Sequence, residues 1–130
     1  MGKSYKSGKW YYDIWRFGNY LDLWSVNHTL AGCVLAGPLY ALSVPFGYSL
    51  LISLIFIVGW EVYEALNDIK ESWQNKSTDV ATGVIGFLFI WYLFPVVTRN
   101  TQIRVYFSLL FIWLTLEIWG YVAYKATSKS

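Results

Sequence analysis

Four apolar stretches divide the chain, and each approaches the length needed to cross a bilayer. They run from about 27 to 44, 46 to 66, 79 to 97 and 103 to 124. A transmembrane helix needs roughly 20 mostly apolar residues, and most charged side chains lie at the ends of these stretches or between them. The pattern predicts an all-α fold: an integral membrane bundle of four transmembrane helices in a single domain, residues 1–130.

A different pattern precedes the first stretch. In WYYDIWRFGNYLDLW apolar positions recur, but aromatic rings dominate and Asp13, Arg16, Asn19 and Asp22 interrupt them. Amphipathic rings of this kind prefer the headgroup region of a membrane. We therefore expect residues 1–26 to form a basic, aromatic arm with an amphipathic segment in the interface. An irregular arm is the alternative.

Composition strengthens the membrane interpretation. Of the 130 residues, 56% are hydrophobic and 14% are charged, whereas soluble domains approach a quarter charged. A net charge of +2 without a basic stripe excludes a nucleic-acid surface. A single histidine, His28, excludes a bis-histidine haem within one chain, and a single cysteine, Cys33, excludes an internal disulfide.

Lysine and arginine positions predict the orientation. These residues are enriched in cytoplasmic loops, and a four-span arrangement places Arg99 and Arg104 on one side and the other eight on the opposite side. We therefore expect a multi-pass protein of the inner (plasma) membrane with both termini cytoplasmic. The eight residues are Lys3, Lys6, Lys9, Arg16, Lys70, Lys76, Lys125 and Lys129.

Small residues mark a predicted contact between two helices. Gly32 and Ala36 lie four apart in the first stretch, and Gly83 and Gly86 lie in the third. Small side chains at such spacing let membrane helices pack backbone to backbone. We predict that these four residues lie where membrane helices pack closely together.

Acidic residues concentrate between the second and third stretches. Five of the eight lie in GWEVYEALNDIKESWQNKSTD. Glu61, Glu64, Asp68 and Glu71 are spaced so that a helix continuing past the membrane would place all four on one face. Like charges in one stripe repel unless something neutralises them. Asp68 and Glu71 are interpreted as solvated charges of the connection.

Further polar residues approach the same end of the predicted bundle. Asp22 and His28 flank the start of the first helix, Asp79 opens the third, and Glu117 lies within the fourth. Plainer interpretations exist, since Asp79 could cap its helix and His28 could be an ordinary interfacial residue. Ionisable residues inside a membrane segment are functional candidates. We expect one polar site near the cytoplasmic face, formed by Asp22, His28, Glu61, Glu64, Asp79 and Glu117.

The expected metal ligands of this site are Glu61, Glu64 and His28. Carboxylate oxygens favour Mg²⁺, Mn²⁺ or Ca²⁺, and an added imidazole also admits iron. The sequence contains no zincin, nucleophile-elbow or phosphate-loop motif. It therefore leaves open whether the protein is an enzyme.

The order DLWSVNHTLAG, WEVYEALN and DVATGVIGFL resembles that of VanZ-like and related small bacterial inner-membrane proteins. The resemblance covers about residues 20 to 90 and implies a helical membrane protein without a settled activity. The chain departs from it at Val80-Ala81-Thr82, where an Asn or Asp is common. The positions that carry it are Asp22, His28, Glu61, Glu64, Asp79, Gly83 and Gly86.

Three functions are compatible with these features. The favoured one is a protein whose cytoplasmic-side site binds a divalent cation or a lipid headgroup. The second is a small ion-coupled transporter in which Glu61 and Glu117 titrate. The third is an accessory structural subunit of a larger membrane complex. The expected partners are the lipid bilayer and either further copies of the chain or a larger membrane complex, with no nucleic acid.

Overall fold

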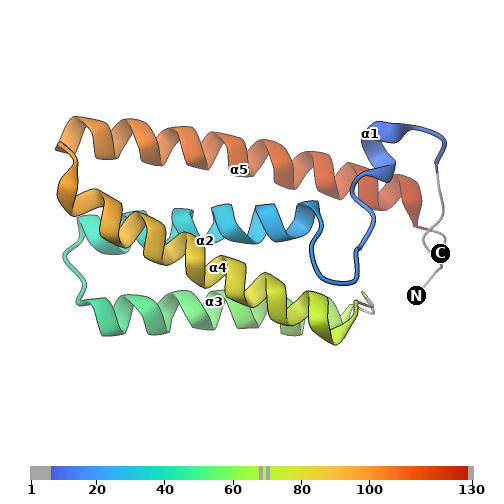
Figure 1. The fold of residues 1–130 in the computed structure, drawn as a ribbon, viewed down its shortest axis with the longest axis horizontal. Coiled ribbons are helices and arrows are strands. Elements are labelled where there is room, and N and C mark those ends of the chain that lie inside the picture. Colours follow the sequence, from blue (N-terminus) through green and yellow to red (C-terminus); the bar gives the residue numbers. More distant parts are fainter. Residues whose placement is uncertain (1–6, 68, 70, 129–130) are drawn as a thin grey trace.

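The computed structural model describes residues 7–67, 69 and 71–128, and these residues form helices without strands, which confirms the all-α prediction. Four long helices run side by side, and α2 lies between α5 and the pair α3 and α4 (Figure 1). The elements are α1 (Trp10–Asp13), α2 (Leu23–Ala41), α3 (Phe46–Leu66), α4 (Trp73–Leu93), the short 3₁₀ helix η1 (Phe94–Val96) and α5 (Arg99–Thr127).

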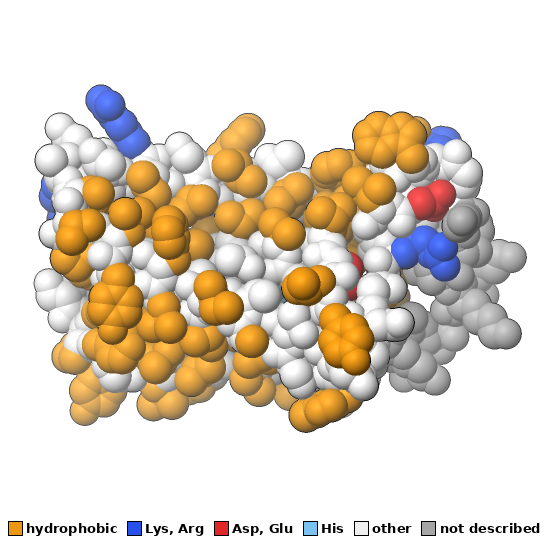
Figure 2. Space-filling view, viewed as in Figure 1, with side chains coloured by type: hydrophobic (Ala, Val, Ile, Leu, Met, Phe, Trp, Pro, Cys, Tyr) orange, Lys and Arg blue, Asp and Glu red, His pale blue; other side chains and the backbone are white. Residues whose placement is uncertain are grey.

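Three segments are long and apolar enough to cross a membrane: Phe46–Leu66, Trp73–Val96 and Arg99–Thr127. Hydrophobic side chains extend along the visible face of the bundle, and acidic side chains gather at the end where α1 lies (Figure 2). Such a continuous apolar exterior suits lipid. The second, third and fourth predicted stretches are thus confirmed as helices of membrane-spanning length, with α4 beginning six residues earlier than predicted.

The first predicted stretch corresponds to α2, which begins at Leu23 rather than at residue 27. This helix has 19 residues, but its first half is too polar for it to join the three helices that are apolar enough to cross a membrane. Its polar side chains face neighbouring helices, because α2 packs against α3, α4 and α5. The structure therefore confirms three of the four predicted spans as helices long and apolar enough to cross a membrane, and a spanning α2 stays a prediction. Its buried polar residues are Ser25, Asn27 and His28.

Local sequence explains where the helices begin. Asp22 caps α2 by accepting a hydrogen bond from the backbone N–H of Ser25 at 3.1 Å. Ser72 caps α4 and Thr98 caps α5 in the same way, each accepting from the N–H three residues on. Short polar side chains satisfy N–H groups that a helix start leaves unpaired. The turn before α3 ends at Pro45, which cannot donate a backbone hydrogen bond.

The small residues lie where α2 and α4 come together. A Cβ added at Gly32 would overlap the carbonyl oxygen of Gly83, and one added at Gly86 would overlap that of Thr29. The Cys33 thiol donates to the Gly86 carbonyl at 3.3 Å. The two backbones therefore touch, which only glycine permits at these positions.

Beyond this contact lies an apolar core at the end of the bundle away from α1. Ala36 is fully buried there beside Phe87 and Ile90. The Phe87 ring stacks on Trp91 with centroids 5.5 Å apart. Phe94 closes the core at the start of η1.

The N-terminal arm is largely irregular between residues 7 and 22, apart from the single turn of α1. Trp15 is buried against the rings of Trp24 and Trp119. Two indole N–H groups fasten the arm: Trp24 donates to the Trp15 carbonyl at 2.9 Å, and Trp119 donates to the Tyr11 carbonyl at 2.7 Å. The described part of the arm thus packs on α2 and α5. Its largely irregular backbone agrees with the irregular alternative, and an amphipathic interfacial helix is not confirmed.

Candidate metal centre

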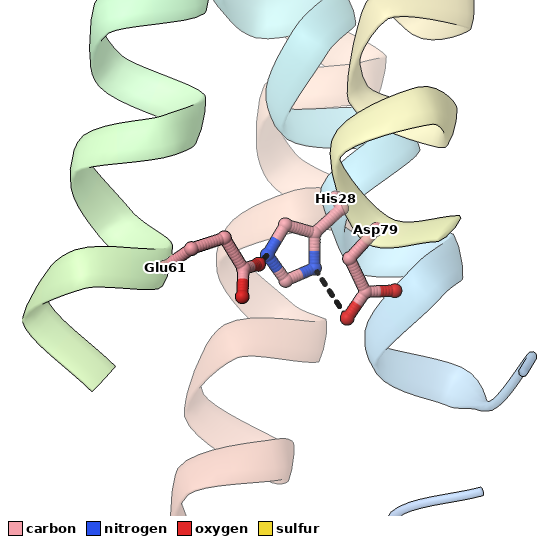
Figure 3. Close-up of side chains that lie close together, drawn as sticks. All are labelled: His28, Glu61 and Asp79. Atoms are coloured by element: carbon pink, nitrogen blue, oxygen red, sulfur yellow. Dashed lines mark ion pairs between the residues drawn. The ribbon is translucent and has the colours of Figure 1, made fainter. Parts of the chain in front are cut away.

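The buried polar residues gather at the end of the bundle where α2 and α4 begin and α3 ends. His28 of α2 lies between Glu61 of α3 and Asp79 of α4 (Figure 3). Its Nε2 is 3.1 Å from Glu61 Oε1, and its Nδ1 is 3.7 Å from Asp79 Oδ2. All three side chains are at least nine-tenths buried, with Asp79 fully so.

A backbone contact fixes the tautomer of His28. Nδ1 lies 2.8 Å from the carbonyl oxygen of Trp24. A carbonyl can only accept a hydrogen bond, so Nδ1 carries the hydrogen. Nε2 then faces Glu61 either as a second N–H or as a free lone pair. Apart from that ion pair, Nε2 and both Glu61 oxygens have no hydrogen-bond partner among the described residues.

Asp79 is held by one oxygen and leaves the other available. Ser25 donates its hydroxyl to Asp79 Oδ1 at 2.6 Å, while Oδ2 has no hydrogen bond within the described chain. The interpretation of Asp79 as a helix cap is wrong, because α4 begins at Trp73 and Ser72 is its cap. Asp79 instead lies inside the helix and faces the bundle.

Glu64 lies one turn after Glu61 and extends the acidic group. Its Oε1 accepts a hydrogen bond from Trp60 Nε1 at 2.9 Å, and its buried Oε2 has no partner in the described region. The expected acidic stripe does not continue, because α3 ends at Leu66. Asp68 lies outside the described residues.

Glu71 returns to this group from the connection between α3 and α4. It is half-buried and accepts a hydrogen bond from Asn75 Nδ2 at 2.9 Å, so its interpretation as a solvated charge is wrong. Burial, and then the carboxylates of Glu64 and Glu61, raise the pKa of Glu71 to about 8. The fold therefore adds a carboxylate to the group that the sequence pattern had assigned to solvent.

The carboxylates form two overlapping groups that share Glu61. One ligand atom each from His28, Glu61 and Asp79 lie within 4.8 Å of one another, and the same holds for Glu61, Glu64 and Glu71. The first group offers nitrogen and oxygen, and the second offers oxygen alone. Each is compact enough for one cation to contact all three members.

Asp22 lies beside these groups but has its hydrogen bonds filled. Its Oδ2 accepts from Gly18 N–H at 2.9 Å and from Asn75 Nδ2 at 3.1 Å. Its Oδ1 caps α2, and the hydroxyl of Ser25 accepts from the Asp22 N–H in return. Asp22 is therefore a helix cap that also connects α2 to α4 through its hydrogen bond with Asn75.

Glu117 is part of neither carboxylate group. Its Oε1 accepts a hydrogen bond from Asn27 Nδ2 at 2.6 Å, which links α5 to α2. Glu117 therefore contacts α2 from α5, whereas Asp79 contacts α2 from α4. The sequence analysis named six site residues, and the structure brings four of them together: His28, Glu61, Glu64 and Asp79.

Two supporting residues were missed, Ser25 and Asn75, and the half-buried Glu71 was wrongly assigned to solvent. Spacing offered a signal for the first two. Asn75, Asp79 and Gly83 are four apart on α4, and Ser25 lies three before His28 on α2, so each continues a face already identified by its small residues. Spacing placed Glu71 on the helix face of Glu61 and Glu64, but α3 ends before it, so its burial depends on how the connection folds back.

No family model matches the chain, and no curated protein or solved structure matches it significantly. The resemblance to VanZ-like proteins therefore stays a prediction. The function has to be argued from the geometry of the site.

Proposed function

We propose that the protein is a small multi-pass membrane protein whose buried site binds a divalent cation through His28 Nε2, Glu61 and Asp79. The arrangement of His28 carries this proposal. Nδ1 donates to a backbone carbonyl while Nε2 points at a carboxylate. Metal-binding histidines typically have one nitrogen oriented by such a hydrogen bond and the other free to coordinate.

Electrostatics supports a cation in this position. Buried charges are costly unless they are paired or coordinate a metal, and the carboxylates of Glu61, Glu64 and Asp79 are all buried near one imidazole. A single imidazolium can offset one of these charges. A divalent cation would offset two and would use the carboxylate oxygens that lack hydrogen bonds.

The donor types favour Mn²⁺ as the first ion to test. Imidazole suits zinc, iron and related transition metals, whereas groups made of oxygen alone suit Mg²⁺, Ca²⁺ and Mn²⁺. Mn²⁺ accepts both kinds of ligand, so it fits the His28 group and the neighbouring all-carboxylate group.

The site would face the cytoplasm in the topology we propose. The chain would cross the inner membrane four times. In addition to α3, α4 and α5, helix α2 would also span the membrane, packed against the other three. Lys9, Arg16, Lys76 and Lys125 belong to the end that carries the site, whereas Arg99 begins α5 at the other end. This distribution supports cytoplasmic termini by the positive-inside tendency. Membership of a VanZ-like group would agree with it.

Thermal unfolding of the detergent-purified chain tests the proposal. Protein stripped with EDTA is titrated with Mn²⁺, and bound ion is counted by electron paramagnetic resonance. A ligand that binds the folded state alone stabilises it by about 2.7 kcal/mol at 100 times its Kd. We expect Glu61→Gln and His28→Gln to abolish the Mn²⁺ effect, and Asp13→Asn, a matched acid-to-amide change in the arm, to retain it.

Two results would count against the proposal. One is a wild-type chain that Mn²⁺ does not stabilise while Glu61→Gln melts at a higher temperature, which would mean that the carboxylates merely repel. The other is Mn²⁺ binding that survives both Glu61→Gln and His28→Gln, which would place the ion elsewhere. The transporter and accessory-subunit hypotheses stay predictions.

A further inference from the structure

A cavity adjoins the metal-binding residues and lies between α2, α3 and α5. Its volume is about 420 Å³, within the range of small-molecule pockets. Its walls are mainly aromatic and aliphatic, and it contains one carboxylate. The residues used below are Trp24 and Asn27 of α2, Phe56 and Trp60 of α3, and Trp113 and Glu117 of α5.

Glu117 supplies the negative charge of this cavity. Its Oε1 accepts a hydrogen bond from the uncharged side chain of Asn27, and the described residues that line the cavity include no lysine or arginine. A carboxylate bordered by apolar walls is costly without a counter-charge. His28 also lines the cavity, but its own charge, when present, is offset by Glu61 at 3.1 Å and Asp79 at 3.7 Å.

The aromatic rings of this cavity suit a cation that contacts their faces. Three indoles and one phenyl ring line the same cavity, and tryptophan is the side chain whose ring face attracts cations best. Two buried polar atoms there, Asn27 Oδ1 and Trp113 Nε1, have no hydrogen-bond partner in the described part. Phe56 is 61% exposed and Trp60 is 44% exposed, which leaves the cavity open between α3 and α5, on the side facing lipid.

We propose that this cavity binds a hydrophobic organic cation, such as a quaternary ammonium or phosphonium, with the aromatic rings around its apolar groups and Glu117 as its counter-charge. The cavity adjoins the proposed metal centre at His28, but its counter-charge is a different residue, since Glu117 belongs to neither metal-binding group. An amphiphile could reach it from the bilayer through the opening beside Phe56 and Trp60.

Two ions of matched shape and opposite charge test this proposal. Tetraphenylphosphonium and tetraphenylborate are each titrated into the EDTA-stripped protein in detergent, with binding followed by calorimetry and by tryptophan fluorescence. We expect saturable binding of the phosphonium and none of the borate. Removing one partner of a desolvated charge pair costs about 2–5 kcal/mol, and each step of about 1.4 kcal/mol is tenfold in affinity, so Glu117→Gln should weaken phosphonium binding by about 30-fold or more.

The control variants separate charge from folding. Glu117→Asp keeps the carboxylate and should keep the preference for the cation, whereas Asp13→Asn should leave the affinity unchanged. Each variant is first checked for a monodisperse elution profile. Equal binding of both ions would overturn the proposal in favour of an apolar lipid-chain pocket, as would full phosphonium binding by Glu117→Gln or none by wild type. The Mn²⁺ titration is read separately, so either proposal can fail alone.

Discussion

The two halves of the contact between α2 and α4 share one backbone geometry but opposite chemistry. Near the start of α2, the Ser25 hydroxyl donates a hydrogen bond to Asp79. His28 lies there between the carboxylates of Glu61 and Asp79. Past the glycines, Ala36 packs with Phe87 and Ile90 in a core without charges. We call these the polar half and the apolar half. The same pair of helices thus supports a site at one end and plain packing at the other.

The difference shows what each half contributes. Lipid is as apolar as a leucine side chain, so membrane helices associate through close packing rather than through the hydrophobic effect. The apolar half fits that rule. The polar half does not, because buried carboxylate oxygens of Glu61, Glu64 and Asp79 lack hydrogen-bond partners among the described residues. Packing alone gives no reason to retain such groups, which favours a ligand.

The largest expected effect comes from breaking the glycine contact that joins the halves. In Gly32→Ala the new methyl group would overlap the carbonyl oxygen of Gly83, and backbone cannot move aside as a side chain can. Overpacking costs typically about 1–3 kcal/mol, and we expect the upper end of that range or more. Thermal unfolding in detergent should show a large fall in the melting temperature, and Mn²⁺ binding should be lost as well.

Gly59→Ala is the matched control, since a Cβ there meets nothing within 4 Å. It should melt at the wild-type temperature or above it, because alanine favours helix over glycine. Equal melting temperatures for Gly32→Ala and Gly59→Ala would show that the two backbones do not touch.

The next effect should be confined to the apolar half. Phe87 is fully buried, and Phe→Ala in soluble cores costs about 3–5 kcal/mol. We expect less here, about 2 kcal/mol, because the unfolded side chain can still rest in lipid or detergent. Phe89→Ala on the same helix, 57% exposed, should cost little. The affinity for Mn²⁺ should survive in both variants, and its loss in Phe87→Ala would show that the halves are coupled.

The converse change should affect the polar half alone. Asp79→Asn preserves the oxygen that accepts the Ser25 hydroxyl but removes a charged ligand from the His28 group. We expect the metal-free melting temperature to fall by less than in Phe87→Ala, while stabilisation by Mn²⁺ drops by at least half. A variant that melts much lower without metal, yet is stabilised by Mn²⁺ as fully as wild type, would make Asp79 a structural residue.

Residues of both the glycine contact and the polar half could be predicted from the sequence alone. Gly32 and Gly83 could each be placed at a position of close helix packing, because small residues at helical spacing let membrane helices approach each other. Glu61 could be placed at a buried site because a carboxylate ending an apolar run is costly in isolation. Because successive membrane helices alternate in direction, His28 and Asp79 could then be placed at the same end of the bundle as Glu61. These inferences needed only periodicity and chain order.

What could not be predicted depends on tertiary contacts. Helix α3 ends at Leu66, and Glu71 returns from the following connection to Asn75. Nothing in the local spacing specifies that return. Trp15 was assigned to the membrane interface by its residue type, yet the rings of Trp24 and Trp119 bury it. An aromatic side chain suits either place, and the sequence alone does not decide between them.

The smallest expected effect concerns Glu71, at the rim of the polar half. Its pKa is raised from 4.5 to about 8, chiefly by burial. The folded chain therefore binds this proton more tightly than the unfolded chain, and stability should fall as pH rises from about 4.5 to about 8. In EDTA, the wild-type melting temperature should decline by a few degrees across that window. Glu71→Gln, which cannot ionise, should show a flatter profile and melt higher than wild type at pH 8 but not at pH 4.5. An equally steep decline in both proteins would mean that the proton is lost elsewhere.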